Sequence, residues 1–368
     1  MRRGPLAVVL LATIDPTVRD LASLALACDL GDGVEVRHEL VAGADGPQEV
    51  RCTVSDITGV VFTSLAELDH GCLSCTVREG LVPTLQWVAE QGRWSSALVT
   101  LPVGAANEQV AQQLQYAIDQ QALQARLAHS LAVVDPETLV DDLLGDHLLA
   151  ERGLALSEHD ARAVGEALSA QLDAADTVVT LDHAQPQASS LLEHVLPPEV
   201  HRVTGLHRLD VGALLAGNHD VEALDARLAP SRRRVRCHEE RDGVWTVVLD
   251  STRAFHPQRL LDQVELLGSG PVRARGCFWL PSRPDAVCVW DGSGGQLSIG
   301  EVGHWCEQER RTRLVVTGTC QETRGRIERA FRDVLLSEHE QSSAAARWAG
   351  RSDGLEAWLG EVELPQAG

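Results

Sequence analysis

Residues 6–30 read LAVVLLATIDPTVRDLASLALACDL, a strand-like run followed by a helix-like run. Positions 6–13 are almost continuously apolar, as in a strand that is buried on both faces. Asp15 and Pro16 then form a helix start, because aspartate caps a helix N-terminus and proline fits its first turn. A buried strand that leads into a helix is typical of an α/β fold.

The same alternation continues through the first two hundred residues. Further strand-like runs are found at residues 34–41, 95–103, 130–135 and 175–182, and helix-like runs at residues 76–91, 107–123 and 158–172. Long helices between apolar strands predict a mainly parallel sheet with helices on both faces. The fold class is therefore predicted to be α/β in this part of the chain.

After about residue 230 the pattern changes to strands at close spacing. Strand-like runs follow at residues 243–251, 272–280, 286–291, 296–302 and 311–319, with amphipathic helices at residues 256–267 and 321–337. This order predicts a smaller α+β domain. We therefore predict an amino-terminal domain at residues 1–230, a linker at 231–242, the α+β domain at 243–337 and a polar tail at 338–368. The tail either lacks order or docks through Trp348 and Trp358.

Composition limits the classes of partner. The 368 residues carry a formal net charge of −21 and include no lysine. Such a surface repels phosphate backbones, so direct nucleic-acid binding is not expected, and basic protein partners or cations are. The basic run at residues 232–236 lies at the predicted domain boundary and is interpreted as a solvated linker.

No targeting or membrane segment is predicted. The N-terminal run MRRGPLAVVLLATID resembles a signal peptide, but it is short and Asp15 interrupts it. No other apolar run approaches the roughly 20 residues that a membrane helix requires. We expect a soluble cytoplasmic protein.

The turn between the first strand and the first helix lacks the parts of a phosphate-binding loop. There is no glycine between Gly4 and Gly31, and no lysine is present to neutralise a phosphate. Asp15 would stand where phosphates bind, and like charges at that position are unfavourable. We predict that Asp15 caps its own helix.

Nine cysteines in a chain of this length indicate reduced thiols, and most are interpreted as small core residues. Cys72 and Cys75 differ because they form a C-x-x-C pair immediately before a predicted helix. A tight turn and a helix N-terminus favour thiolates, and two thiolates are half of a tetrahedral zinc site. Candidate further ligands are His70, Asp69, Glu67 and residues 237–240. From spacing alone, metal binding, redox exchange and a buried structural pair all remain open.

These motifs together resemble the CobW-type family of metal-handling P-loop GTPases. Residues 70–79, HGCLSCTVRE, are similar to the family's G-C-x-C-C motif, with Ser74 at the central cysteine. Residues 253–260 (RAFHPQRL) and 272–290 (VRARGCFWLPSRPDAVCVW) are similar to the family's carboxy-terminal domain. The resemblance implies a P-loop NTPase-like first domain, and zinc ligands at Cys72, Cys75 and, as a weaker candidate, His70.

The family's nucleotide motifs are changed in this chain. Its G-x-x-x-x-G-K-T would fall at Ala12 to Arg19, with Asp15 inside it and Val18 at the lysine position. Its acidic strand-end motif is replaced by LPVGAA, with Leu101 at the carboxylate position. Its N-K-x-D would fall at residues 181–184, LDHA. We therefore expect a pseudo-GTPase that hydrolyses no GTP, although Arg19 leaves a residual hydrolase as an alternative.

The forms of these motifs are similar to a divergent bacterial branch of the family. That branch is associated with zinc limitation and with recruiting a hibernation factor to ribosomes. The resemblance implies a zinc-responsive adaptor that acts on the ribosome and a hibernation factor. Two alternatives are a zinc metallochaperone with a client protein and an interaction module whose cysteine pair binds no metal.

Overall fold

The computed structural model of the chain describes residues 4–42, 48–67, 73–230, 236, 239–305, 310–348 and 351–361. The chain forms two compact units. The first comprises residues 1–139, 147–185 and 199–226, and the second comprises residues 140–146, 186–198 and 227–368. The two units therefore interleave along the chain and do not divide at a single residue.

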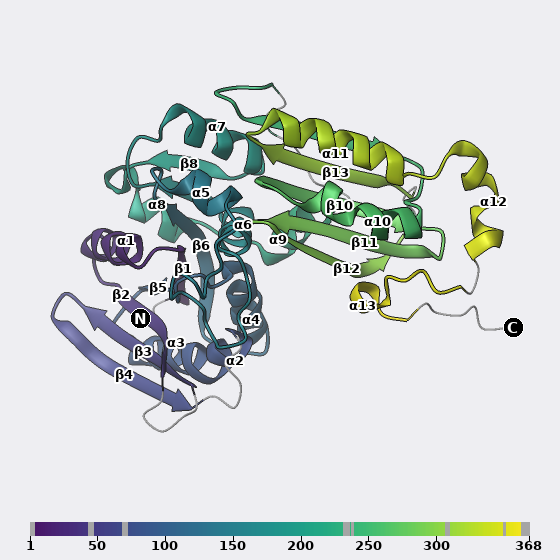
Figure 1. The fold of residues 1–368 in the computed structure, drawn as a ribbon. Helices are drawn as coiled ribbons and strands as arrows, with labels where there is room; N and C mark the ends of the chain where they lie inside the picture. Colours follow the sequence, from purple (N-terminus) through teal and green to yellow (C-terminus); the bar gives the residue numbers. More distant parts are fainter. Residues whose placement is uncertain are drawn as a thin grey trace, which may run out of the picture. The chain divides into compact units, whose positions relative to one another are not determined.

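Over the described residues, the first unit is built on an eight-stranded sheet in the order β4-β3-β2-β5-β1-β6-β7-β8 (Figure 1). The strands are β1 (Leu6–Ala12), β2 (Val34–Ala42), β3 (Gln48–Asp56), β4 (Gly59–Glu67), β5 (Ser96–Thr100), β6 (Ala125–Val134), β7 (Thr177–Thr180) and β8 (His201–Thr204). Only the two pairings that involve β3 are antiparallel among those described. The prediction of a mainly parallel sheet is confirmed, and β1 is buried along its whole length.

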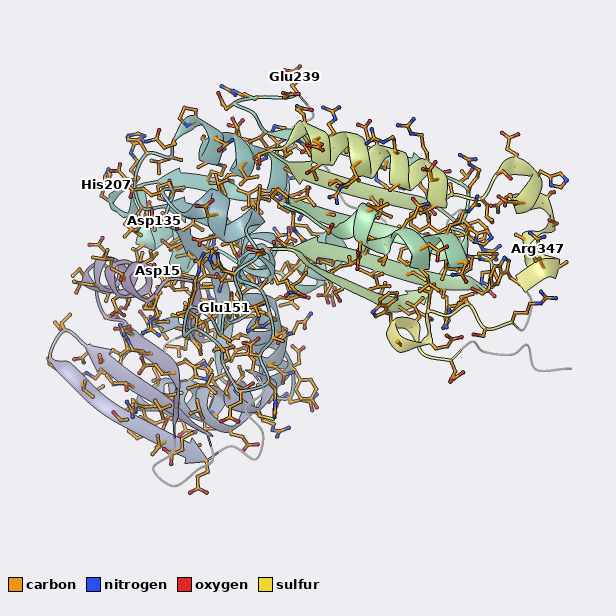
Figure 2. All side chains as sticks on the ribbon, viewed as in Figure 1. Asp15, Asp135, Glu151, His207, Glu239 and Arg347 are labelled. Carbon is orange, nitrogen blue, oxygen red and sulfur yellow. The ribbon has the colours of Figure 1, made fainter. Side chains whose placement is uncertain are left out.

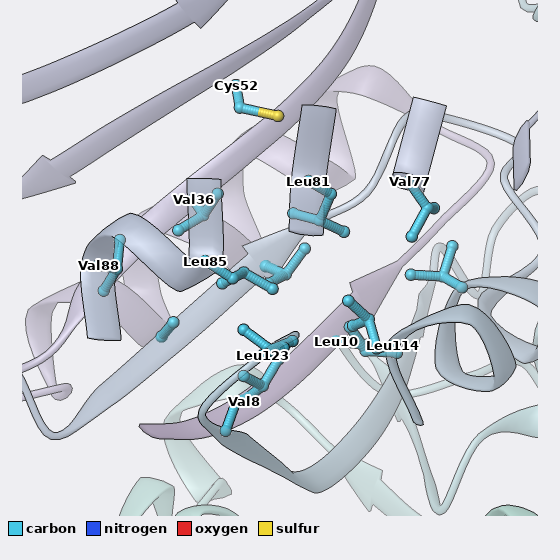
Figure 3. Packing of buried hydrophobic residues seen from close by; sticks show 14 of the residues in the cluster. Val8, Leu10, Val36, Cys52, Val77, Leu81, Leu85, Val88, Leu114 and Leu123 are labelled. Carbon is cyan, nitrogen blue, oxygen red and sulfur yellow. The ribbon is translucent and has the colours of Figure 1, made fainter. Parts of the chain in front are cut away.

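Helices cover both faces of this sheet, as predicted. The helical segments of the unit are α1 (Pro16–Cys28), α2 (Leu73–Thr76), η1 (Val77–Leu81), α3 (Val82–Gln91), α4 (Asn107–Asp119), α6 (Val164–Ala174), η2 (Leu206–Arg208), α8 (Val211–Ala216) and α9 (Val221–Leu228). On one face, Leu85 of α3 and Leu114 of α4 pack against β1 and its neighbours (Figure 3). On the other face, Val18 of α1 and Leu214 of α8 form a second core.

The β3–β4 hairpin was not predicted. Its strands pair antiparallel, from Glu49 opposite Glu67 to Asp56 opposite Gly59, and Gly59 at the turn has a φ of +112°, which favours glycine. The alternating pattern of residues 49–55 is the sequence signal for this hairpin. Two other boundaries also differ from prediction, since β6 already begins at Ala125 and α6 begins only at Val164.

The second unit contains a five-stranded sheet in the order β12-β11-β10-β13-β9. Its elements are α5 (Leu139–Leu144), α7 (Pro186–Val195), β9 (Trp245–Ser251), α10 (Pro257–Gly268), β10 (Val272–Leu280), β11 (Arg283–Ser293), β12 (Gln296–His304), β13 (Thr312–Gly318), α11 (Gln321–Val334), α12 (Glu338–Trp348) and α13 (Glu356–Leu359). All described pairings in this sheet are antiparallel, and Leu260 of α10 and Phe331 of α11 pack onto one face. The predicted α+β domain is confirmed.

The tail beyond residue 337 contains helices α12 and α13 and is held by a buried arginine. The Arg283 guanidinium donates to the Asp353 carboxylate, with Nε to Oδ2 at 2.9 Å, and to the carbonyl oxygen of Leu359 at 2.8 Å. Leu355 and Leu359 are buried in the core of the second unit. Trp348 contacts the His256 ring edge-on, whereas Trp358 is 43% exposed. The tail therefore docks mainly through leucines and Asp353. None of the helices described is long and apolar enough to cross a membrane.

Candidate functional site

The two turns that the sequence points to lie at the same edge of the first sheet. Strand β4 pairs antiparallel with β3, which pairs antiparallel with β2, so β4 runs in the same direction as β1. Their carboxyl ends therefore both lie at the edge where α/β proteins bind ligands. Because three strands separate β4 from β1, these two strands are about 19 Å apart across the sheet.

The turn after β1 is closed by Asp15, as predicted. Its Oδ1 accepts hydrogen bonds from the N–H of Thr17 at 2.6 Å and from the N–H of Val18 at 2.9 Å. These are the amides at the start of α1 to which an anion would otherwise bind. Figure 2 marks Asp15 at the start of this helix. The Asp15 carboxylate thus accepts the hydrogen bonds that these two amides can donate.

A buried glutamine fastens the same turn. Gln171 of α6 is fully buried, and its Nε2 donates to the carbonyl oxygens of Thr13 at 3.1 Å and Ala105 at 2.9 Å. The Gly104 N–H also donates to the Thr13 carbonyl, at 3.0 Å. The turns after β1 and β5 are thereby linked to each other. Sequence reasoning missed Gln171, which is one of three buried polar residues of α6, together with Ser169 and Asp173.

The side chains at the start of α1 provide no cation to this turn. Val18 is buried in the core beneath α1. Arg19 lies 3.5 Å from the Glu39 carboxylate and 3.5 Å from that of Asp20, and its side chain is only 13% exposed. The guanidinium is thus held among carboxylates on α1 and β2. The residual hydrolase that Arg19 suggested stays an alternative.

The other nucleotide positions also lack the expected chemistry. Leu101, after β5, is buried in the core next to α4. Asp182, after β7, is exposed, and its Oδ1 accepts from the N–H of His183 at 2.7 Å. Asp135, after β6, accepts from the N–H of Glu137 at 2.8 Å (Figure 2). Leu101 is thus apolar, and Asp182 and Asp135 each accept a hydrogen bond from a backbone N–H of their own turn.

The cysteine turn lies between β4 and α2. Of the predicted ligands, Cys72 and His70 lie outside the described residues, as do Asp69, Cys237 and His238. Cys75 is described: it belongs to α2 and is half-buried against the core of the first unit. A thiol near the N-terminal end of a helix is favoured as a thiolate, which suits a soft metal such as zinc. The role of Cys75 as a zinc ligand stays a prediction.

The remaining thiols divide by burial. Burial raises the pKa of the Cys52 and Cys277 thiols to about 11 and that of Cys288 to about 12, so these are inert core residues, as predicted. Cys28 and Cys320 are exposed, which corrects the prediction for those two positions. Within the described parts of the chain, no group of three or more histidine, cysteine or acidic residues is arranged to hold a metal ion.

Two protein families and several known proteins are similar in sequence to parts of this chain. Residues 31–196 match the CobW/HypB/UreG nucleotide-binding domain, and residues 244–335 match the cobalamin synthesis protein cobW C-terminal domain. A Mycobacterium tuberculosis protein named as a zinc chaperone is 29% identical over 289 residues, which cover 71% of this chain and 66% of the relative. The zinc-regulated GTPase metalloprotein activator 1 of Dictyostelium discoideum is 20% identical over 290 residues, which cover 70% of this chain and 58% of the relative.

The chain thus spans less than two thirds of the length of either relative. Among solved structures, the Zn(II)-bound YjiA GTPase from E. coli is 14% identical with a TM-score of 0.38, and the match covers 90% of this chain and 99% of that one. The match to the nucleotide-binding domain begins at residue 31 and so leaves out β1, the Asp15 turn and α1. Residues 31–196 are thus similar to the CobW/HypB/UreG nucleotide-binding domain, and residues 244–335 to the CobW C-terminal domain.

Proposed function

We propose that the protein handles zinc through its cysteine turn and acts on a protein client without hydrolysing GTP. The observation that carries this proposal is the placement of Cys75, a half-buried thiol at the start of a helix on the ligand-binding edge of the sheet. Cys75 and Cys72 would be zinc ligands, with His70 as a candidate third. The names of two relatives, a zinc chaperone and a zinc-regulated metalloprotein activator, support a metal-handling role.

The proposal that GTP is not used rests on the turn after β1. The carboxylate of Asp15 takes the amides to which a phosphate would bind, and the lysine position holds the buried Val18. A triphosphate there would face a negative charge without a compensating cation, which is unfavourable by several kcal/mol at short range. The described residues therefore do not fit a triphosphate.

Delivery of zinc to a client is favoured over a role at the ribosome. The relative named as a zinc chaperone aligns over 71% of this chain, which supports the delivery function. An adaptor that recruits a hibernation factor to ribosomes remains a second proposal, carried only by the resemblance of the sequence motifs. In either case, the formal net charge of −21 would favour binding to a partner with a basic surface.

The test is zinc affinity measured by competition with a chromophoric chelator, on reduced protein. Loss of a thiolate ligand in Cys75→Ser should weaken binding on the order of 100-fold, and Cys72→Ser should do the same. Cys28→Ser is the matched control, because Cys28 is an exposed thiol at the far end of α1. Equal affinities in all four proteins would contradict the proposal. Co-sedimentation of the zinc-loaded protein with ribosomes would favour the adaptor over the chaperone.

A further inference from the structure

The helix that carries Cys75 contains an irregular turn immediately after the cysteine. Segments α2, η1 and α3 follow one another without a break from Leu73 to Gln91, and η1 is a five-residue π-helix. A π turn contains about one residue more than an α turn, so it rotates everything before it about the helix axis. The rotation for one residue is about 100°. The direction in which Cys75 faces therefore depends on this turn.

Packing against the sheet fixes one side of the π turn. Val77 and Leu81 are fully buried, and both point into the core of the first unit (Figure 3). Gly80 lies directly on β3, because a Cβ at this position would be 2.7 Å from Cγ1 of Val50. Arg78 and Glu79, on the other side, are exposed. The extra residue is thus accommodated toward solvent.

A pair of hydroxyls ties the turn to the strand on the other side of the cysteine loop. The Thr84 hydroxyl donates to the Gly80 carbonyl oxygen at 2.8 Å, and it also lies 2.8 Å from the hydroxyl of Ser64 on β4. Since Thr84 has a single hydroxyl proton, Ser64 must donate to Thr84. Thr84 is buried, so this link is shielded from competing water.

We propose that Thr84 and Ser64 are positioning residues that hold the π turn in register and thereby aim Cys75 toward the metal. The inference rests on the proposed zinc-binding function of Cys75. Supporting side chains that orient a ligand typically change metal affinity by 10- to 100-fold when they are removed. Both side chains are hydroxyls, which are not the usual zinc ligands, so they would act on zinc affinity through Cys75.

The test compares zinc affinity in five proteins: the wild type, a deletion of Glu79, Glu79→Ala, Thr84→Val and Thr84→Ser. Deletion of Glu79 restores an ordinary helical turn and rotates Cys75 by about 100°, so zinc affinity should fall at least 10-fold. Glu79→Ala keeps the number of residues in the turn, so its zinc affinity should stay within 2-fold of that of the wild type. Thr84→Val removes the hydroxyl at nearly constant shape and should lower zinc affinity about 10-fold. Thr84→Ser keeps the hydroxyl and should bind zinc as tightly as the wild type.

The absorption spectrum of the Co²⁺-loaded protein distinguishes a changed orientation of the Cys75 thiol from unfolding of the variant. A misdirected Cys75 should weaken the thiolate-to-cobalt band in Thr84→Val under conditions in which circular dichroism shows the protein to be folded. Wild-type zinc affinity in both the deletion variant and Thr84→Val would overturn this inference and leave the proposed function intact. A wild type that binds no zinc, or that binds it as well after Cys75→Ser, would overturn both.

Discussion

Two turns at one edge of the same sheet have opposite local chemistry. At the β1–α1 turn, Asp15 satisfies the first amides of a regular helix, and Gln171 fixes the carbonyl groups behind it. After β4, helix α2 carries the half-buried thiol of Cys75 in its first turn and is followed by a π turn. The first turn is satisfied by its own side chains, whereas the second carries a thiol. This difference supports our proposal that zinc binds at the second turn.

The largest expected effect concerns a buried histidine in the first sheet. His38 of β2 is fully buried, and burial lowers its pKa to about 4 from an ordinary 6.5. Between these pH values the unfolded chain binds more protons than the folded one, so the free energy of unfolding falls as the pH falls. From pH 7 to pH 4.5 the loss should be about 2–3 kcal/mol.

His38→Leu should remove this part of the acid sensitivity, because leucine does not titrate. The measurement is urea unfolding of the wild type and His38→Leu at pH 7 and pH 4.5. The stability difference between the two proteins should shift in favour of the variant at the lower pH. If it is the same at both pH values, His38 is protonated in the folded protein and our account of this core is wrong.

The next effect concerns how tightly the β1–α1 turn is closed. Gln171→Leu removes the amide that donates to the carbonyl oxygens of Thr13 and Ala105, and a buried carbonyl that loses its partner costs about 1–3 kcal/mol. Gln115→Leu is the matched control, since the Gln115 amide donates to Asp119 on the solvent side of α4. Thermal unfolding should show a clear loss for Gln171→Leu alone. Equal melting temperatures would mean that Gln171 does not support the turn.

The smallest expected effect is on stability, and it comes from replacing Asp15, the residue that caps α1. Asp15→Ala removes the acceptor for the N–H groups of Thr17 and Val18 and should destabilise the protein by about 1 kcal/mol. Asp15→Asn keeps an acceptor oxygen without the charge and should be nearly as stable as the wild type. Neither variant should bind GTP, because the lysine position remains Val18. Tight GTP binding by Asp15→Asn would show that the charge alone had blocked a working phosphate site.

The sequence predicted the alternation of strands and helices and the cap at Asp15, because both depend on local pattern and on residues close together in the chain. It did not predict the β3–β4 hairpin, whose pairing depends on neighbours in the sheet more than on the alternation of its residues. It also missed Gln171, which meets Thr13 from 158 residues away. Contacts between residues far apart in the sequence leave no periodic signal.

The cysteine turn likewise has features that the sequence predicted and features that it did not. The C-x-x-C spacing pointed to Cys75, and the structure places it on a helix at the ligand-binding edge. Nothing in the spacing indicated the π turn, because π-helices arise from packing such as that of Gly80 against Val50. Cys72 and His70 remain predictions, since they lie outside the described residues.

The most direct test of the central claim measures zinc and GTP binding on the same reduced sample. We predict about one zinc ion bound per chain, lost in the Cys72→Ser/Cys75→Ser double variant, and no GTP binding at micromolar concentrations of nucleotide. GTP binding at such concentrations would contradict our account of the β1–α1 turn. Zinc binding that is absent, or unchanged in the double variant, would contradict our account of the cysteine turn.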